Sequence, residues 1–179
     1  RFMTSHPKDV SDRLISVMSR CVPKVAPCFH LPLQSGSDAV LRAMHRTYDR
    51  EHYLEIEEKL RDAVPGIALS TDVIVGFPGE RDEDFEDTLA VLSGVRFDNV
   101  YSFLYSKREG TRAATMEKQV PESVKSARMA RLLSLQDGIS RERAAAYVGK
   151  TLRVLCDGAD RRGGENLRCG KSATGYLVH

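Results

Sequence analysis

Short apolar runs rich in β-branched residues alternate with amphipathic stretches along the first two thirds of the chain, and this alternation constrains the fold more than any other feature. The runs at 29–33, 67–75 and 100–105 have the length and residue types of buried strands. The stretches between them repeat apolar residues every three or four positions, as helices do. Strands that alternate with helices usually pair in parallel. The sequence therefore predicts an α/β protein with a parallel sheet.

Residues that favour helix starts precede the amphipathic stretches. Side chains that can accept from free backbone N–H groups are those of Asp9 or Ser11, Ser37 and Asp49. Acidic residues crowd 80–84, where the positive end of a helix dipole favours them. A long helix is expected from Pro121 to about Val148, and its inward positions would be Val124, Leu132, Leu135 and Ile139.

The C-terminal segment has a different pattern. Residues 151–157 alternate with period two, glycines at 158 and 163–164 supply turns, and 174–178 can form a further strand. This predicts the opening of a small β-barrel that stops before the barrel could close. The expected organisation is a parallel-sheet domain at 1–120, a linking helix at 121–148 and a partial β-module at 149–179.

Charge divides the chain in a similar way. Residues 1–120 carry 16 basic and 19 acidic side chains, whereas 121–179 carry 11 and 6, a net charge of +5. A basic segment favours an anionic partner, with RNA ahead of a membrane because no amphipathic helix bearing Trp or Phe accompanies it. The alternative is an ordinary solvated charged surface.

The sequence lacks membrane, secretion and metal-binding signals. No apolar run approaches the roughly 20 residues that cross a bilayer, and the first residues lack a signal-peptide core. Because the chain opens on Arg1 and a strand-like end, we expect an internal part of a longer protein. The spacing of the five histidines and four cysteines matches no metal-ligand pattern, so we expect no metal site and reduced thiols in a cytoplasmic protein. The cysteines are Cys21, Cys28, Cys156 and Cys169.

The first strand-to-helix junction carries an amide, two hydroxyls and a glycine. Gln34, Ser35, Gly36 and Ser37 follow the expected strand at 29–33. Functional groups collect at this edge of parallel sheets, and the free N–H groups of a helix start bind anions. The segment suits a ligand with hydroxyls or a carboxylate. Alternatively, Gln34 and Ser35 only shape the loop, with Ser37 as the helix cap.

The second junction is rich in glycine. Gly76 and Gly79 follow the strand at 67–75 and allow the backbone to approach a ligand closely. Asp72 stands inside an otherwise apolar strand and needs a polar partner. Glu80 could act only as an acidic residue at a helix start. A glycine-rich turn of this kind does not by itself identify a ligand.

The third junction is basic. Tyr105 ends the strand at 100–105, and the loop after it carries Lys107, Arg108 and Arg112, which could meet a polyanion such as RNA. Aromatic residues that alternate along such a strand more often belong to the core.

Four segments, in this order, resemble the radical S-adenosylmethionine (SAM) methylthiotransferases of the MiaB type. They are TSHPKD at 4–9, HLPLQSGSDAVLRAM at 30–44, STDVIVGFPGE at 70–80 and FDNVYSFLYSKREGTRAA at 97–114. Together they span most of the chain. The first and last favour the tRNA-modifying enzymes over the RimO-type relatives, which act on a ribosomal protein, and over the threonylcarbamoyladenosine-modifying relatives.

The resemblance implies a partial (β/α) barrel, with its second half at 1–120, and the opening of a TRAM RNA-binding module at 149–179. It implies reductive cleavage of SAM and insertion of a methylthio group at C2 of an N6-isopentenylated adenosine beside the tRNA anticodon. The partners would be that anticodon loop and donors of sulfur and electrons, in the cytoplasm. The target base would have to leave its stack, at least cost in a single-stranded loop.

The cofactors of the family are SAM and two [4Fe–4S] clusters with cysteine ligands. Its CxxxCxxC motif is absent from this chain, and none of the four cysteines matches a ligand position. The clusters would therefore belong to the full-length protein, and this segment alone would bind none and be inactive.

The resemblance also assigns roles to individual residues. The ribose and methionyl side of SAM would be contacted by Gln34, Ser35, Gly36 and Ser37. The adenosyl group would be flanked by Asp72, Ile74, Gly76, Phe77, Pro78, Gly79 and Glu80, with the adenine near Tyr105. RNA would be met by Lys107, Arg108 and Arg112 and, in the TRAM segment, by Arg153, Arg161 and Arg162. Arg112 replaces a proline of the family's pattern, which puts the conformation of that loop in doubt.

Two further functions stay open. The chain could be an RNA-binding module with the α/β part as scaffold, or an α/β enzyme that uses SAM without iron. The second is disfavoured because the chain has no GxGxxG nucleotide-binding motif.

Overall fold

The computed structural model describes residues 5–22, 24–160 and 167–179. Two three-stranded sheets and the helices around them make up the described chain. The helices are η1 (Pro7–Asp9), α1 (Asp12–Arg20), α2 (Asp38–Ala43), α3 (Arg50–Ala63), α4 (Asp82–Val95), α5 (Arg112–Thr115) and α6 (Glu122–Ala145). The strands are β1 (Cys28–His30), β2 (Ala68–Val75), β3 (Asn99–Leu104), β4 (Val154–Ala159), β5 (Arg168–Ser172) and β6 (Leu177–Val178).

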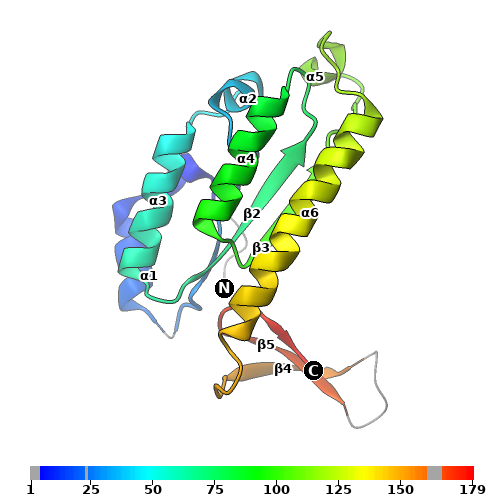
Figure 1. Cartoon of the computed structure of the whole chain (residues 1–179). Coiled ribbons are helices and arrows are strands. Elements are labelled where there is room, and N and C mark those ends of the chain that lie inside the picture. The colour runs from blue at the N-terminus through cyan, green and yellow to red at the C-terminus, as the bar shows by residue number, and fades with distance from the viewer. Residues whose placement is uncertain (1–4, 23, 161–166) are drawn as a thin grey trace.

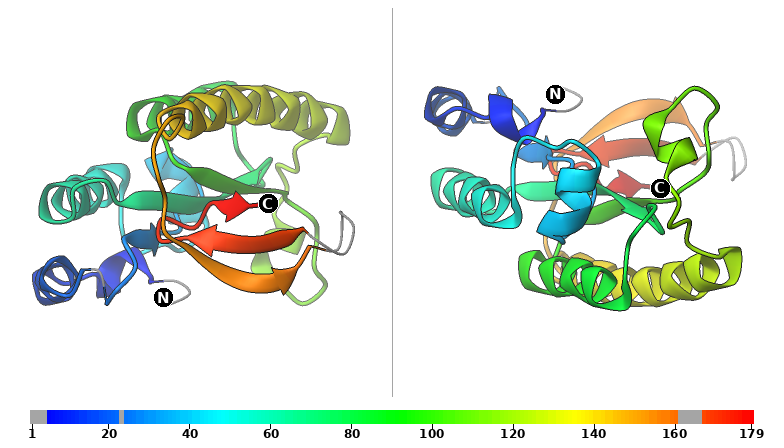
Figure 2. Two further views of the ribbon diagram at one scale, coloured as in Figure 1. Left: turned by 90° about the horizontal axis from the view of Figure 1, so that it is seen from below. Right: turned by 90° about the horizontal axis from the view of Figure 1, so that it is seen from above.

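The first sheet is parallel, with strand order β1-β2-β3. Helices α1, α3, α4 and α6 cover one of its faces (Figure 1, Figure 2). The strand residues that point toward the helices form the core, whereas alternate residues on the other face are half-buried or exposed. The buried strand residues include Phe29, Leu69, Val73, Val75 and Val100. The predicted α/β class with a parallel sheet is confirmed.

The caps expected for three helices are present. Ser11 accepts from the backbone N of Leu14, and Asp49 accepts from that of His52. Ser37 caps α2. Asp9, the alternative cap, lies in η1 instead. Each cap satisfies a backbone donor that the helix leaves free, so the first turn can form in water.

Helix α6 differs from its prediction at both ends and along its buried face. It begins at Glu122, with Pro121 as the N-cap residue, and ends at Ala145 rather than near Val148. Leu132 and Ile139 are buried as expected. The other two expected positions are only half-buried, and the polar side chains of Lys125, Arg128 and Gln136 are buried instead. Their partners on the sheet and its loops explain this difference, as described below.

The second sheet is antiparallel, with order β4-β5-β6, and lies below the amino-terminal ends of the parallel strands (Figure 1). Strand β5 was not predicted, because Arg168–Ser172 contains a glycine and two basic residues and no clear alternation. The view from below shows this sheet on the side of the parallel strands that faces away from α4 and α6 (Figure 2).

Candidate functional site

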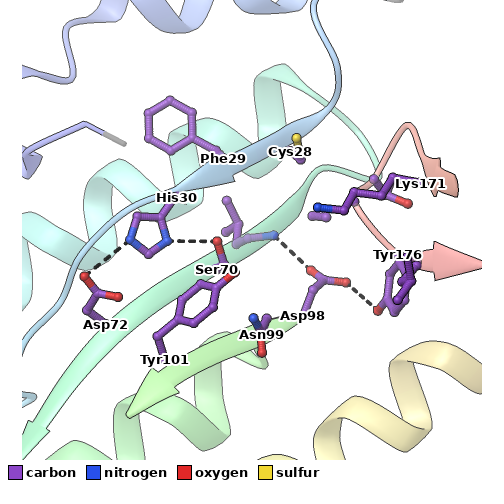
Figure 3. Close-up of a pocket in the computed structure, with 15 residues that line it drawn as sticks. Cys28, Phe29, His30, Ser70, Asp72, Asp98, Asn99, Tyr101, Lys171 and Tyr176 are labelled. Carbon is purple, nitrogen blue, oxygen red and sulfur yellow. Dashed lines mark hydrogen bonds and ion pairs between the residues drawn. The ribbon is translucent and has the colours of Figure 1, made fainter. Parts of the chain in front are cut away.

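Polar and aromatic side chains gather on the open face of the parallel sheet (Figure 3). The Nδ1 atom of His30 lies 3.0 Å from Oγ of Ser70, and its Nε2 atom lies 3.5 Å from Oδ2 of Asp72. The Tyr101 ring meets the His30 ring edge-on, with centroids 5.7 Å apart. These residues share one face because side chains in neighbouring strands alternate in register. Asp72 thus has the polar partner that its place in an apolar strand required.

A cavity of about 780 Å³ adjoins this face. One wall is formed by residues of β1, β2 and β3, among them His30 and Tyr101 on the open face. The C-terminal sheet supplies the other wall through Lys171 and Tyr176 (Figure 3). The cavity is therefore bounded by segments from both ends of the chain.

Gln34 is held at the next level of the same sheet in a strained conformation. Its backbone N donates to the carbonyl of Asp72 at 2.8 Å, and its carbonyl accepts from the N of Ile74 at 2.9 Å. Its φ angle is +71°, a left-handed value that costs energy for a residue with a Cβ atom. The side chain is 8% exposed. The structure thus brings together three predicted site residues, Gln34, Asp72 and Ile74, from two segments.

Ser35, Gly36 and Ser37 contact α4. The Oγ of Ser37 donates to Oδ1 of Asp84 at 2.6 Å, and the N of Gly36 donates to Oγ1 of Thr88 at 2.9 Å. Ser35 is completely buried, and its hydroxyl lies 3.4 Å from that of Thr88. A Cβ atom on Gly36 would come within 2.6 Å of the α4 backbone. Ser35 and Ser37 use their hydroxyls to join the start of α2 to α4. Within this segment, Gln34 and main-chain groups are the parts left for the predicted contact with a cofactor.

The electrostatics of Asp84 explain why this junction tolerates a buried carboxylate. Burial opposes ionisation, but hydrogen bonds from the Ser37 hydroxyl and from the backbone N and side chain of Arg81 outweigh it, so the pKa of Asp84 lies below its ordinary value. The loop after β1 is therefore fastened to α4 by an ionised group.

The loop from Gly76 to Glu80 is also anchored from within. Glu80 accepts from the backbone N of Gly76 at 2.8 Å and from Nη1 of Arg128 at 2.7 Å. Burial raises the pKa of Glu80, and the Gly76 N–H and the Arg128 guanidinium partly counteract this. Gly76 has φ +77°, and a Cβ atom there would lie 2.4 Å from the Lys125 side chain. Glu80 is thus a buried anchor of the loop rather than only an acidic residue at a helix start.

An aromatic group stands at the carboxyl ends of β2 and β3. The rings of Phe77 and Tyr105 meet edge-on, with centroids 5.4 Å apart. Nζ of Lys125 lies 5.5 Å from the centre of the Tyr105 ring and donates to the Tyr105 carbonyl at 3.0 Å. The hydroxyl of Tyr105 is buried and has no hydrogen-bond partner among the described residues. A buried hydroxyl without a partner is costly, and a polar ligand atom that reached it would relieve that cost.

The predicted RNA-binding residues are exposed wherever the structure describes them. Lys107 and Arg108 lie in the loop after β3, and Arg112 begins α5. Arg153 precedes β4. Arg161 and Arg162 lie outside the described residues. The loop and β4 groups belong to different ends of the parallel sheet, so the structure does not join them into one cluster (Figure 1).

Three polar residues of this region were not predicted from the sequence. The spacing of the histidines assigned no role to His30, although its partners Ser70 and Asp72 occur two residues apart on the neighbouring strand. Lys125 and Arg128 lie in the stretch expected to form a long helix and are not among its expected inward positions. Their spacing of three, which places both on one helix face, was the available signal.

The described residues contain no group of three or more His, Cys, Asp or Glu side chains that could hold a metal ion. Cys21, Cys28, Cys156 and Cys169 are free thiols, and their positions do not converge on one another as cluster ligands would. The described part of the chain therefore does not fit an iron–sulfur cluster.

The three parallel strands carry helices on one face and polar groups on the other. This arrangement is typical of (β/α) barrel enzymes, whose ligands bind at the carboxyl ends of the strands. The profile of the Radical SAM superfamily matches residues 3–92, half of the chain. The chain therefore belongs to the radical SAM superfamily. In agreement, the fold resembles coproporphyrinogen III oxidase from Escherichia coli, a radical SAM enzyme, with a TM-score of 0.62 and 16% identity over 76% of this chain and 31% of that one.

More specific similarity comes from curated proteins named tRNA-2-methylthio-N(6)-dimethylallyladenosine synthase. The protein from Alkaliphilus oremlandii is 49% identical over 100% of this chain, which spans 38% of that protein. The one from Acetivibrio thermocellus is 53% identical over 90% of this chain and 33% of its own length. The chain thus spans little more than a third of the relatives that it matches.

The residues at the carboxyl edge fit the SAM that the superfamily implies. Ile74 and Tyr105 are half-buried and offer apolar surface for a purine beside the buried Phe77 ring, and the Tyr105 hydroxyl has no partner among the described residues. Asp72 and Gln34 offer acceptors beside them for ribose hydroxyls.

Proposed function

We propose that this chain forms the cofactor-binding half of a radical SAM methylthiotransferase that acts at C2 of N6-isopentenyladenosine beside the anticodon of tRNA. The observation that carries the proposal is the identity of about half of all residues, over 100% of the chain, to tRNA-2-methylthio-N(6)-dimethylallyladenosine synthases. Identity at this level usually preserves a functional site.

In this proposal the residues of the chain bind and orient the cofactor. Bound SAM supplies a carbon-centred radical after reduction. Ile74 and Phe77 would enclose the adenine, Tyr105 would donate to it, and Asp72 would accept from the ribose. Gln34 would be held in position by its two backbone bonds to β2. Ser35, Gly36 and Ser37 would support this arrangement from α4, and Pro78, Gly79 and Glu80 would shape the loop around it.

The partners proposed are an isopentenylated tRNA anticodon loop and donors of sulfur and of electrons, in the cytoplasm. The exposed cations Lys107, Arg108 and Arg112, with Arg153 in a TRAM-like module, would meet RNA phosphates. The two [4Fe–4S] clusters would be held by parts of the full-length protein other than the described residues. None of the described helices is long and apolar enough to cross a membrane.

The test uses the full-length protein that contains this chain, reconstituted with iron and sulfide without oxygen. It is incubated with SAM, reductant and isopentenylated tRNA, and the digested nucleosides are analysed by mass spectrometry. A methylthiolated isopentenyladenosine supports the proposal. Cleavage of SAM without that product would indicate a methylthiotransferase that acts on another substrate. Absence of both cleavage and product, with tRNA still bound, would leave an RNA-binding module.

A matched pair of variants tests the site itself. Ile74→Ala enlarges the proposed adenine site on the open face, whereas Leu133→Ala removes an exposed side chain from α6. Equilibrium binding of SAM should weaken about tenfold for Ile74→Ala and stay unchanged for Leu133→Ala. Equal affinity for both variants would move the adenine away from Ile74.

A further inference from the structure

Asp98 joins three separate segments of the chain at the amino-terminal end of the parallel sheet, and its contacts with β2 and Tyr176 are drawn in Figure 3. Its Oδ2 atom accepts from the backbone N of Leu69, at the start of β2, at 2.9 Å. Its Oδ1 atom accepts from the hydroxyl of Tyr176 at 2.9 Å. Arg143 of α6 donates to both oxygens, each at 2.9 Å. The side chain of Asp98 is 8% exposed, so this carboxylate is buried with four donors around it.

Tyr176 belongs to the turn between β5 and β6 and stands 78 residues from Asp98. Its ring also meets the ring of Tyr147, just after α6, with centroids 5.0 Å apart. The hydroxyl of Tyr147 lies 3.3 Å from that of Thr174 in the same turn. The turn is therefore held at two points, once on the sheet side by Asp98 and once on the helix side by Tyr147.

The charges strengthen this contact. Burial, followed by the negative charge of Asp98, raises the pKa of Tyr176, so its hydroxyl stays protonated and donates at neutral pH. The hydrogen bonds from Arg143 to Asp98 raise the pKa of Arg143. Bidentate arginine–carboxylate pairs have a defined geometry, unlike contacts of a flexible ammonium group. Removing one partner of a buried carboxylate of this kind strongly destabilises the fold, because the charge stays buried with fewer hydrogen bonds.

We propose that Asp98 is a positioning residue that holds the C-terminal β-sheet at a set angle below the parallel sheet, so that RNA bound by the C-terminal sheet reaches the carboxyl edge in one orientation. The RNA part of this inference rests on the proposed function. The contact would fix the position of three exposed cations, which are Arg153 just before β4 and Arg168 and Lys171 in β5. Without it, the same cations would bind RNA on a sheet that rotates about the connection at 146–153.

The test compares Tyr176→Phe and Asp98→Ala with a matched control in the full-length protein that contains this chain. Tyr176→Phe keeps the ring contact with Tyr147 and removes only the donor to Asp98. The control is Arg96→Gln, which breaks the exposed ion pair of Arg96 with Glu142 on the same part of α6. Far-UV circular dichroism establishes that each variant retains its helices.

The first readout is limited trypsin digestion followed by mass spectrometry. Lys150 and Arg153 lie in the connection between α6 and β4 and report whether the C-terminal sheet detaches. Cleavage there should accelerate about tenfold in Tyr176→Phe, more in Asp98→Ala, and not in Arg96→Gln, because loss of a charged hydrogen bond raises the detached fraction by about that factor. Unchanged cleavage in both Asp98-site variants would overturn the proposal.

The second readout is the yield of methylthiolated nucleoside at saturating tRNA, beside the affinity for tRNA. The proposal expects the affinity to change less than threefold and the yield per bound tRNA to fall about tenfold, because the cations remain but their orientation is lost. An unchanged yield with a detached sheet would overturn the positioning role. If the unaltered protein binds no tRNA, the proposed function fails, whereas the digestion result still tests whether Asp98 holds the sheet.

Discussion

The Glu80 carboxylate and the Arg128 guanidinium form an ion pair in which Oε2 lies 2.7 Å from Nη1, and their side chains are 1% and 8% exposed. Arg128 also donates to the carbonyl of Glu80 and to Asp82. The pair fastens the loop after β2, where the candidate cofactor site lies, to the helix that leads to the C-terminal sheet. The loop is thus fixed by a pair of buried charges.

Glu80→Ala should lower the free energy of unfolding by about 3 kcal/mol, because it leaves the Arg128 guanidinium buried beside fewer acceptors. Urea denaturation measures this. The control is Glu86→Ala, which breaks the solvent-exposed pair of Glu86 in α4 with Arg131 in α6 and should hardly move the midpoint. Equal losses in the two variants would show that burial does not distinguish these pairs.

Ser37→Ala should destabilise the protein in a pH-dependent way. The pKa of Asp84 is lower in the folded protein than its ordinary value of 3.8, so its contribution is present above that pH and is lost as the pH falls through the lowered value. Removing the Ser37 donor should cost about 2 kcal/mol at pH 7, and the cost should fall toward the roughly 1 kcal/mol of the helix cap alone as the pH drops through the lowered pKa of Asp84. Ser11→Ala, a cap without a carboxylate partner, should cost about 1 kcal/mol throughout this pH range.

Gly36→Ala should destabilise the contact between α2 and α4 by about 2 kcal/mol, because the new Cβ atom would meet rigid backbone at 2.6 Å. Gly94→Ala lies on an exposed face of α4 with no heavy atom within 4 Å of the added carbon. That control should stabilise the helix by about 0.5 kcal/mol. Thermal denaturation compares the two, and equal midpoints would contradict the close approach of the loop to α4.

Tyr105→Phe should leave stability unchanged or raise it by about 1 kcal/mol, since the hydroxyl is buried with no partner in the described part of the chain. If that hydroxyl binds the cofactor, the same variant should lose about tenfold in SAM affinity. Tyr48→Phe is the control, because the Tyr48 hydroxyl donates to the Leu33 carbonyl at 3.0 Å and its loss should destabilise. Calorimetry with and without SAM separates the two effects.

Arg108→Ala and Arg153→Ala should weaken tRNA binding and each reduce the slope of log K against log salt by about one, the expectation for a lost phosphate contact. The control is Arg131→Ala, because Arg131 is paired with Glu86 on the outer surface of α4 and α6. Filter binding at several salt concentrations gives the slopes. A slope that changes equally in all three variants would assign the effect to net charge.

Much of the parallel-sheet part was predictable because its signals are local. Ser37 and Asp49 precede helices that begin at the next residue, and the strand expected at 67–75 matches β2 within one residue. Capping and β-branched runs act over a few residues, so short segments of sequence contain them. Strand β5 was not predicted, because it forms by pairing with the backbone of β4 and has no apolar pattern of its own.

The sequence predicted where the residues of the candidate site lie, but not what each side chain contacts. Gln34, Asp72 and Ile74 do meet at one level of the sheet, as the junctions suggested. Ser35 and Ser37, expected to face the ligand, are instead engaged with α4, and their contact with a cofactor stays a prediction. A hydroxyl at a helix start can serve either role, and only the approach of α4 decides between them.

The sequence by itself determined the alternation of strands and helices, the caps and the glycines of the loop after β2, because these depend on neighbours within one turn or one strand. Only the tertiary structure decided which charges are buried. Glu80 with Arg128, and Asp98 with Arg143 and Tyr176, are 48, 45 and 78 residues apart. A charged residue looks the same in sequence whether it faces water or a partner, and its energy is set by the desolvation and the donors that folding brings to it.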